Sequence, residues 1–409
     1  MQLTTKAPRL HAYLLILLLF CITSAAKADV ITDWNVTARD IVVDAKIYTP
    51  PANRVMSIVH TAIYASINSI TQEYSKSEFE LDATTGASIE AAVASASHTT
   101  LLRLLPSQKQ QIEAAYAGAL KGVSEGTKKQ DGIALGKKVA AAVLSARAND
   151  GSDVLESYRP YTTAGQYVPT VIPAVPHWPN RTPWLLQSAS QFRPGPPPSL
   201  TSETWANDFN EVKEIGSSSS TTRTKEQTAI AKFWEATLPP IYHGVVHSVA
   251  KQLGRTPTQN ARLFALVTQA TDDAIIAVFD AKYHYSFWRP VTAIRNADMD
   301  NNDATQRDAS WAAYIPTPMH PEYPCAHCVV AATVGTILKE EVGGGPMPTL
   351  TTSSITANGA TRSWASIEEF VQEVSNARIY DGVHYRTSTE SGNSMGYKIG
   401  AQAIEKFAK

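Results

Sequence analysis

The chain has 409 residues, of which 44% are hydrophobic and 18% are charged, so it is long enough to bury one large core or two smaller ones. Its formal net charge is −1, which provides neither the basic surface that nucleic-acid binding needs nor a strongly acidic tail. With only 3 cysteines, the chain is not a disulfide scaffold. We therefore expect a globular protein whose partners are not nucleic acids.

The N-terminus is typical of a secretory signal peptide. Lys6 and Arg9 precede an apolar run at 12–20, and the small-x-small sequence at 26–28 forms a cleavage site before Asp29. The apolar run is shorter than the roughly 20 residues of a membrane-spanning helix, and no later stretch is suited to spanning a bilayer. We predict a signal peptide over 1–28 and export to a periplasmic or extracellular location.

Apolar residues recur at helical spacing in both halves of the chain, with little sign of strands. Thr258 is a candidate N-cap for the most regular of these helices, which ends near Lys282. Pro324 stands just before another helix, where a proline in the first turn is favourable. The predicted fold is all-α, with helices at about 53–67, 87–105, 107–122, 130–148, 224–237, 243–253, 258–281, 326–342, 363–379 and 397–407.

The helical pattern stops between about 149 and 222. Many prolines interrupt this segment, including three in a row at 196–198, and 217–220 is a run of serines. Long irregular segments in compact proteins tend to line a site or to cross its surface. We predict a single helical domain over 29–409 that carries this proline-rich insertion.

Three short segments carry the residues with the clearest chemistry. Segment 282–290 begins with Lys282 and ends in Arg289-Pro, segment 324–327 reads Pro-Cys-Ala-His, and segment 378–384 runs from an arginine to a histidine. A lysine and two arginines together suit a tetrahedral oxyanion such as phosphate or vanadate. We therefore predict an oxyanion site within 280–390.

The two histidines of these segments are placed for catalysis. His327 lies in the first turn of a predicted helix, where unpaired backbone N–H groups already favour an anion. His384 follows Arg378 by six positions, across a helix-breaking Gly382, so both side chains can face one pocket. An approachable neutral imidazole nitrogen can attack phosphorus or coordinate a metal oxyanion.

The three segments resemble the signatures of the superfamily that joins type 2 phosphatidic-acid phosphatases with vanadium-dependent haloperoxidases. Its pattern is K-x6-R-P, then P-S-G-H, then S-R-x5-H, and the spacing and order match here. Segments 54–64, 260–266, 280–295 and 321–324 resemble the haloperoxidase-like branch in particular. The resemblance spans about 50–405 and implies a large helical bundle of the acid phosphatase/vanadium haloperoxidase type.

The resemblance also implies a cofactor and roles for single residues. Vanadate would be the cofactor, its equatorial oxygens bound by Lys282, Arg289 and Arg378, with a further donor in the backbone N–H of the residue that replaces the family's glycine. In a phosphatase, phosphate would be the substrate at the same place. The implied oxyanion-binding residues are Lys282, Arg289, Cys325, Ala326 and Arg378.

The implied catalytic residues are Lys282, which would polarise peroxide, and two histidines. His327 would be the acid–base residue, and His384 would be the ligand to vanadium or, in a phosphatase, the nucleophile that becomes phosphorylated. His320 stands where bromoperoxidase-type members carry histidine and chloroperoxidase-type members carry an aromatic residue. A halide pocket at His320 therefore implies that bromide or iodide is the favoured substrate beside hydrogen peroxide.

Five positions depart from the family pattern, and two of them are cysteines spaced C-x-x-C. A c-type haem attachment needs a histidine where Val329 stands, and a zinc site needs more ligands than His320 and His327 supply nearby. A thioredoxin-like redox pair is a further alternative, and a local disulfide in an exported protein is our preferred interpretation. The departures are Cys325, Ala326, Cys328, Ala377 and Ser388.

A reduced Cys325 would change the expected chemistry. A thiol beside vanadate and peroxide would be oxidised or would reduce the metal. Either Cys325 and Cys328 form a disulfide, or the site handles phosphate, or activity is lost. The sequence thus leaves three hypotheses: a haloperoxidase that oxidises halide with hydrogen peroxide, an acid phosphatase that hydrolyses phosphate esters through His384, and an impaired relative that binds anions or senses redox state.

Outside these segments, His243 and His247 stand one helical turn apart, as zinc ligands do, but no glutamate lies at the metalloprotease position between them. We expect them to line a helix surface or a pocket. Asp272 and Asp273 are expected on the polar face of their helix, with pairing to an arginine of the oxyanion site as the alternative.

Overall fold

The computed structural model describes residues 29–83, 86–252 and 254–408. The predicted signal peptide at 1–28 lies outside the described residues. The described chain consists of α-helices joined by loops, with one two-stranded antiparallel hairpin of β1 (Leu350–Ser353) and β2 (Thr361–Trp364). The prediction of an all-α helical bundle is confirmed.

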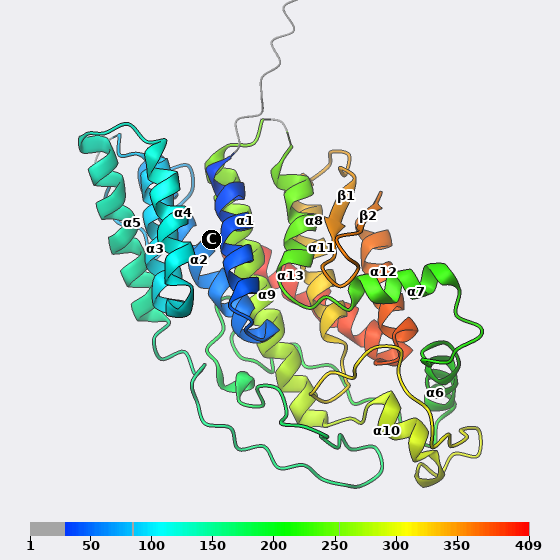
Figure 1. Cartoon of the computed structure of the whole chain (residues 1–409). Helices are drawn as coiled ribbons and strands as arrows, with labels where there is room; N and C mark the ends of the chain where they lie inside the picture. Colours follow the sequence, from blue (N-terminus) through cyan, green and yellow to red (C-terminus); the bar gives the residue numbers. More distant parts are fainter. Residues whose placement is uncertain (1–28, 84–85, 253, 409) are drawn as a thin grey trace, which may run out of the picture.

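The N-terminal part of the molecule is a group of long helices (Figure 1). α2 runs through its centre and packs against α3, α5 and the later helix α9. Sequence periodicity indicated only part of α2 and did not indicate α1. The helices of this part are α1 (Val30–Asp44), α2 (Thr49–Thr71), α3 (Ile89–Leu104), α4 (Lys109–Lys121) and α5 (Thr127–Ala146).

The C-terminal part is built around α11, which packs against α13, α9 and α12. α13 is twice as long as the helix expected at its end. β1 lies between two predicted helices, and β2 takes the first residues of the helix predicted at 363–379. The helices of this part are α6 (Glu203–Ile215), α7 (Lys225–Trp234), α8 (Pro240–Ala250), α9 (Pro257–Tyr285), α10 (Pro290–Arg295), α11 (Ala326–Val342), α12 (Ile367–Tyr380) and α13 (Arg386–Ala408).

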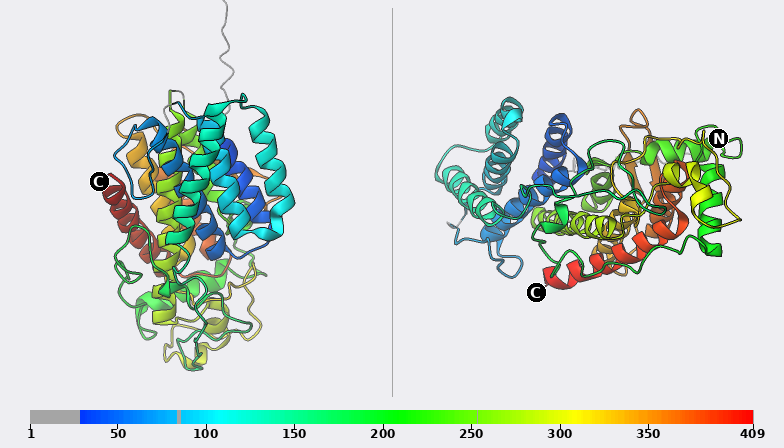
Figure 2. Two further views of the ribbon diagram at one scale, coloured as in Figure 1. Left: turned by 90° about the vertical axis from the view of Figure 1, so that its left-hand side faces the viewer. Right: turned by 90° about the horizontal axis from the view of Figure 1, so that it is seen from below.

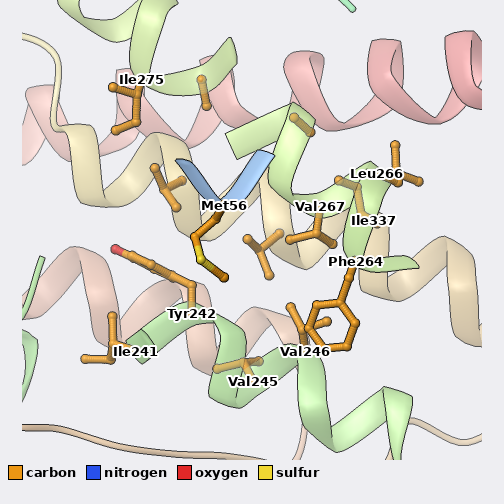
Figure 3. Packing of buried hydrophobic residues seen from close by; sticks show 14 of the residues in the cluster. Met56, Ile241, Tyr242, Val245, Val246, Phe264, Leu266, Val267, Ile275 and Ile337 are labelled. Carbon is orange, nitrogen blue, oxygen red and sulfur yellow. The ribbon is translucent and has the colours of Figure 1, made fainter. Parts of the chain in front are cut away.

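The two parts share one hydrophobic core, seen from close by in Figure 3. Met56 of α2 lies between Tyr242 of α8 and Val267 of α9, and Phe264 packs beside Val246. Tyr242 is 5% exposed and the others are fully buried. Each such side chain stabilises the fold by roughly 1.5–3 kcal/mol, so this core holds α9 firmly against both parts.

The N-cap of the 29-residue helix α9 lies two residues before the predicted one. Thr256, not Thr258, is the cap: its side chain accepts from the Gln259 N–H while the Gln259 side chain accepts from the Thr256 N–H. Pro257 then occupies the first helical position, which suits its fixed φ. The expectation failed because Thr258 lies inside the helix.

The proline-rich segment is less irregular than predicted, and it is attached to α9 by hydrogen bonds. It includes α6, whose cap Ser202 accepts from the Trp205 N–H. It is also tied to α9, because Arg181 donates to Asp272 at 2.6 Å and three successive N–H groups, 184–186, donate to Asp273. Asp272 and Asp273 are fully buried, so their expected place on a polar face is wrong.

The loops gather at one end of the helices. In the views of Figures 1 and 2 the green trace before α6 and the yellow trace after α10 lie at the end where α9 finishes. Within the described residues, no helix has both the length and the apolar character needed to cross a bilayer. The end of α9 thus meets long loops, which provide the walls of a site.

Candidate functional site

Four helix ends bring the three predicted segments together. Lys282 lies in the last turn of α9, Arg289 caps α10, His327 is in the first turn of α11, and Arg378 is in the last turn of α12. His384 follows α12 directly, in the short connection to α13. A cavity of about 600 Å³ opens at this point, and its lining includes Arg289, His320, Ala326, His327, Arg378 and His384.

Gly382 allows the chain to turn between Arg378 and His384. Its φ is +82°, in the left-handed region, and a Cβ there would lie 2.3 Å from the carbonyl oxygen of Gly216. The N–H of His384 also donates to the Arg378 carbonyl at 3.1 Å. The predicted helix break is therefore present, and it returns the imidazole to the arginine's side of the chain.

Lys282 is fully buried beside the cavity and does not line it. Its Nζ donates to the carbonyl oxygens of Pro321 at 3.0 Å and Glu322 at 2.7 Å. An ammonium has three donors, so one is left for a ligand. Burial, together with the charge of Arg289, holds the Lys282 pKa well below its usual value, while Glu322 opposes this shift.

Arg289 is 1% exposed and lies between two backbone acceptors and two imidazole nitrogens. Its Nε and one Nη donate to the backbone carbonyls of His320 at 2.9 Å and Val383 at 2.8 Å. The same Nη lies 3.3 Å from His384 Nε2, and the other Nη lies 3.0 Å from His320 Nδ1. The guanidinium is thus fixed in orientation next to both imidazoles.

Arg378 is equally buried but less fully satisfied. One Nη donates to the Trp234 carbonyl at 2.7 Å and pairs with Asp381 at 2.8 Å. Its Nε has no partner among the described residues, although it is buried. A buried donor without a partner is costly, so this Nε is suited to bind an anion in the cavity.

His384 is fixed in one tautomer by a carboxylate that the sequence interpretation missed. Its Nδ1 lies 2.7 Å from Glu322 Oε1, so Nδ1–H donates and Nε2 keeps its lone pair. Burial raises the pKa of Glu322 to about 7, and burial and then Arg289 hold the pKa of His384 well below its usual value. The family pattern carries an aspartate where this chain has Ser388, and that departure was the signal to look for another carboxylate.

The first turn of α11 offers unpaired backbone donors. Cys325 is the N-cap, and its Sγ accepts from the Cys328 N–H at 3.3 Å, as a serine oxygen would. The N–H groups of Ala326 and His327 have no intramolecular hydrogen bond in the described part of the chain. The predicted donor role of Ala326 is thereby available.

The two cysteines are separate, buried thiols in this structure, so the disulfide that we preferred for them is not present. The sulfur of Cys325 instead caps the helix, and Cys328 packs on α13, where a Cβ at Gly392 would lie 2.9 Å from its Cβ. Burial opposes ionisation of Cys325, but the hydrogen bond from Cys328 and the charge of Arg378 leave its pKa lower than usual.

The remaining predicted residues are His320 and His327. His320 packs its ring on Phe279 at 5.1 Å between centroids and lines the cavity. His327 Nε2 lies 3.2 Å from the Ala236 carbonyl, so Nε2–H donates and Nδ1 carries the lone pair. Burial, and then Arg378, lower the pKa of His327 well below its usual value. His327 is therefore neutral and able to accept a proton.

Together these groups fit a tetrahedral oxyanion. Three cationic side chains face two buried carboxylates, Glu322 and Asp381, which leaves one positive charge in excess when all are ionised. The unpartnered Arg378 Nε and the free amides of Ala326 and His327 add hydrogen-bond donors, and His384 Nε2 is an acceptor nitrogen in the same lining. Several hydrogen-bond donors in a positively charged site are what a tetrahedral oxyanion needs.

His243 and His247 lie away from this cavity lining, in the core. His243 Nδ1 lies 2.9 Å from the Asn35 side-chain nitrogen, and His247 Nε2 lies 2.9 Å from the Asn35 oxygen. His60 Nε2 is also 2.9 Å from that nitrogen. No group of three or more metal-ligating side chains is found in the described ranges. These histidines form a buried hydrogen-bond network, not the helix surface or pocket lining that we expected.

Comparisons with known proteins support the predicted superfamily. Residues 262–409 match the family model described as the VCPO second helical-bundle domain. Over 151 residues, which are 31% of this chain, the sequence is 28% identical to the vanadium chloroperoxidase of Curvularia inaequalis. That match spans about a quarter, 24%, of the chloroperoxidase.

Two solved structures share the fold over almost the whole chain. A bacterial vanadium-dependent iodoperoxidase superposes with a TM-score of 0.77 and 23% identity, covering 92% of this chain and 96% of that one. A bacterial vanadium-dependent chloroperoxidase in its holo form gives a TM-score of 0.69 and 17% identity, covering 88% and 93%. At such identities the likeness shows the fold, and with the sequence matches it confirms the predicted superfamily.

Proposed function

We propose that this chain, a member of the superfamily that includes the vanadium haloperoxidases, oxidises halide with hydrogen peroxide at a vanadate-binding site between α9, α11 and α12. The observation that carries the proposal is a cavity lined by Arg289, Arg378 and His384, with the buried Lys282 beside it and free backbone amides at the start of α11. The vanadium haloperoxidases found in the comparisons support it.

In this proposal, Lys282, Arg289 and Arg378 hold the oxygens of vanadate, and His384 Nε2 is the ligand to vanadium. The Ala326 N–H provides a further donor at the positive end of α11. Vanadate, when bound, supplies the Lewis-acid centre that makes peroxide reactive toward halide. The protein's own contribution is to place and orient these donors in a site away from bulk water.

His327 is the proposed acid–base residue. With Nε2–H donated to Ala236, its Nδ1 is the nitrogen that can take a proton from an incoming peroxide. Its lowered pKa keeps it neutral, and so ready to accept, at ordinary pH. Lys282 would polarise the bound oxygen through its remaining N–H, because its two carbonyl acceptors fix the direction of that donor.

The halide that we propose is bromide or iodide, through a pocket at His320. His320 lines the cavity, and its Nδ1 faces an Nη of Arg289. An arginine and an imidazole beside an apolar wall formed by Phe279 would suit a large, weakly hydrated anion. The chain would meet these substrates after export, as the N-terminal sequence predicts.

A second candidate is an acid phosphatase in which His384 Nε2 attacks phosphorus. It is favoured by one observation, the free thiol of Cys325 with its lowered pKa, which is ill suited to peroxide chemistry. Burial reduces this objection, since Cys325 is 0% exposed and the thiols most prone to oxidation are accessible. The haloperoxidase therefore remains the first proposal.

The test is to assay the purified full chain with orthovanadate, hydrogen peroxide and either bromide or iodide, and separately with a phosphate ester without vanadate. The haloperoxidase proposal expects halide oxidation that depends on vanadate, with about one vanadium per chain. His384→Ala should abolish it, while His284→Ala, an exposed histidine two residues after Lys282, should not. Phosphate-ester turnover with no halide oxidation would replace the first proposal by the second.

A further inference from the structure

Glu322 connects two of the predicted catalytic groups, although it belongs to none of the three motif segments. We infer that Glu322 is the positioning residue for His384, holding its Nδ1–H so that the Nε2 lone pair faces Arg289 and the oxyanion cavity. This inference refines the proposed site, and it applies whether that site holds vanadate or phosphate.

The side chain of Glu322 holds both the ring of His384 and the backbone that follows it. Oε1 accepts from His384 Nδ1–H at 2.7 Å and from the Tyr385 N–H at 3.1 Å. An ionised acceptor makes the stronger kind of hydrogen bond. Two donors on one oxygen fix the position of that oxygen, and therefore the rotation of the imidazole ring.

The backbone of Glu322 holds a second group of the site. Its carbonyl accepts from Lys282 Nζ at 2.7 Å, and its N–H donates to the Phe287 carbonyl at 2.9 Å. The residue is thus anchored to the end of α9 by its main chain and to His384 by its side chain. A shift of Glu322 would move the lysine and the imidazole together.

Ser388 is the competing partner for His384, because it occupies the position at which the family pattern carries an aspartate. Its Oγ lies 3.5 Å from His384 Nδ1, at the limit for a hydrogen bond, and it carries no charge. The carboxylate of Glu322 is 0.8 Å closer and approaches from a different segment of the chain. Glu322, and not Ser388, is therefore the acceptor of the hydrogen bond from His384 Nδ1–H.

Glu322 is also buried without full satisfaction. It is 0% exposed, and its Oε2 has no hydrogen-bond partner within the described residues. A buried carboxyl oxygen without a partner is unfavourable for stability alone. A positioning role gives this carboxylate a reason to be retained in the core, which a purely structural role would not.

The test measures the tautomer of His384 directly. The full chain is labelled with ¹⁵N-histidine, and the His384 signals are assigned from their loss in His384→Gln. We expect the wild-type ring to be protonated on Nδ1, and Glu322→Ala to give a mixture of tautomers and at least a tenfold weaker affinity for orthovanadate. Glu322→Gln keeps a carbonyl acceptor, so it should retain the tautomer and lose less affinity.

Ser388→Ala is the comparison variant, because it removes the other side-chain contact to Nδ1, and a hydroxyl beside Glu322, while the Glu322 carboxylate stays in place. It should leave both the tautomer and the orthovanadate affinity unchanged. The inference is overturned if wild-type His384 is protonated on Nε2, a result that needs no variant, or if Ser388→Ala and not Glu322→Ala changes the tautomer. Absence of orthovanadate binding by the wild type would count against the proposed function, while the tautomer would still decide the role of Glu322.

Discussion

Arg181 donates to both carboxylate oxygens of Asp272, at 2.6 and 3.0 Å, and both side chains are completely buried. Arg181 also contacts Asp150 at 2.8 Å, and Asp150 in turn pairs with Arg54 of α2. This network attaches the proline-rich segment to the middle of α9. Since α9 ends at the oxyanion site, the network also stabilises the wall of the cavity.

Asp272→Asn should therefore be strongly destabilising. It removes one carboxylate from a buried guanidinium, and breaking a buried pair in this way costs about 3 kcal/mol or more. The measurement is the free energy of unfolding from urea titration. Arg193→Ala is the control: it breaks a partly exposed pair with Asp280 and should cost about 1 kcal/mol or less. Equal losses in the two variants would contradict the prediction.

Arg378 is expected to bind the oxyanion through its unpartnered Nε. Arg378→Ala removes a charged hydrogen bond worth about 1.5–3 kcal/mol, so the dissociation constants for orthovanadate and for phosphate should rise by roughly ten- to a hundredfold. Arg378→Lys should recover part of this loss, because it restores the charge but not the planar fork of donors. Isothermal titration calorimetry measures both.

Arg386→Ala is the matched control for that series. Arg386 lies only two residues after His384, but its guanidinium pairs with Glu211 and is 29% exposed. Its loss should leave the affinity for either anion within about twofold of the wild type, because an exposed pair contributes little. If Arg386→Ala weakened binding as much as Arg378→Ala, long-range charge and not the Arg378 contact would explain the result.

Cys325 should determine how the site withstands peroxide. Its lowered pKa favours oxidation, whereas burial raises the pKa of Cys328 well above the usual value. Because Cys325 is buried, only a large excess of peroxide should add oxygen to the wild type, at Cys325 before Cys328, and reduce orthovanadate affinity, as followed by peptide mass spectrometry and binding. Cys325→Ser keeps the N-cap and should resist this loss. Cys328→Ala should lose orthovanadate affinity as the wild type does. If Cys328→Ala were protected instead, Cys328 and not Cys325 would be the oxidised residue.

The sequence predicted those parts of the site that depend on local spacing. Arg378, Gly382 and His384 lie within seven consecutive residues. The motif and the glycine therefore predicted that the arginine and the histidine face the same cavity. Glu322 could not, because its bond to His384 joins positions 62 apart and depends on how α11 packs against α12. Asp272 was misplaced for the same reason, since its partner Arg181 lies 91 residues earlier in a segment without helical periodicity.

The prediction of the fold from the sequence was limited in the same way. Helices with strong apolar spacing, such as α9 and α11, were predicted to within a few residues. α6 was missed because it follows closely after 196–198, a run of prolines that hides the start of its pattern. The network of His60, His243 and His247 was invisible because Asn35, which joins the three rings, lies on α1, a helix that the pattern did not indicate.

The histidine network around Asn35 predicts that the protein loses stability in mild acid. Burial and then Lys251 lower the pKa of His247 to about 4 in the folded state, against a usual value of about 6.5. Below pH 6.5 the unfolded chain binds a proton that the folded chain does not, so stability falls as the pH falls from 6.5 toward 4. His60, with a pKa lowered to about 3 by burial, acts in the same direction.

Buried carboxyl groups act in the opposite direction. Burial raises the pKa values of Asp273, Glu322 and Asp381 to about 7, so these groups gain stability as the pH falls from 7 toward their unfolded values. The total pH profile therefore mixes the two effects. A difference between the wild type and a histidine variant isolates the imidazole contribution.

His247→Gln provides that difference, because glutamine can still donate to the Asn35 oxygen but does not titrate. Between pH 7 and pH 5 the wild type should lose about 2 kcal/mol more unfolding free energy than His247→Gln, as one proton is bound only by the unfolded chain. The exposed His284→Gln should follow the wild-type profile. Parallel profiles for wild type and His247→Gln would mean that His247 titrates freely in the folded protein, which its burial against Asn35 and Phe264 argues against.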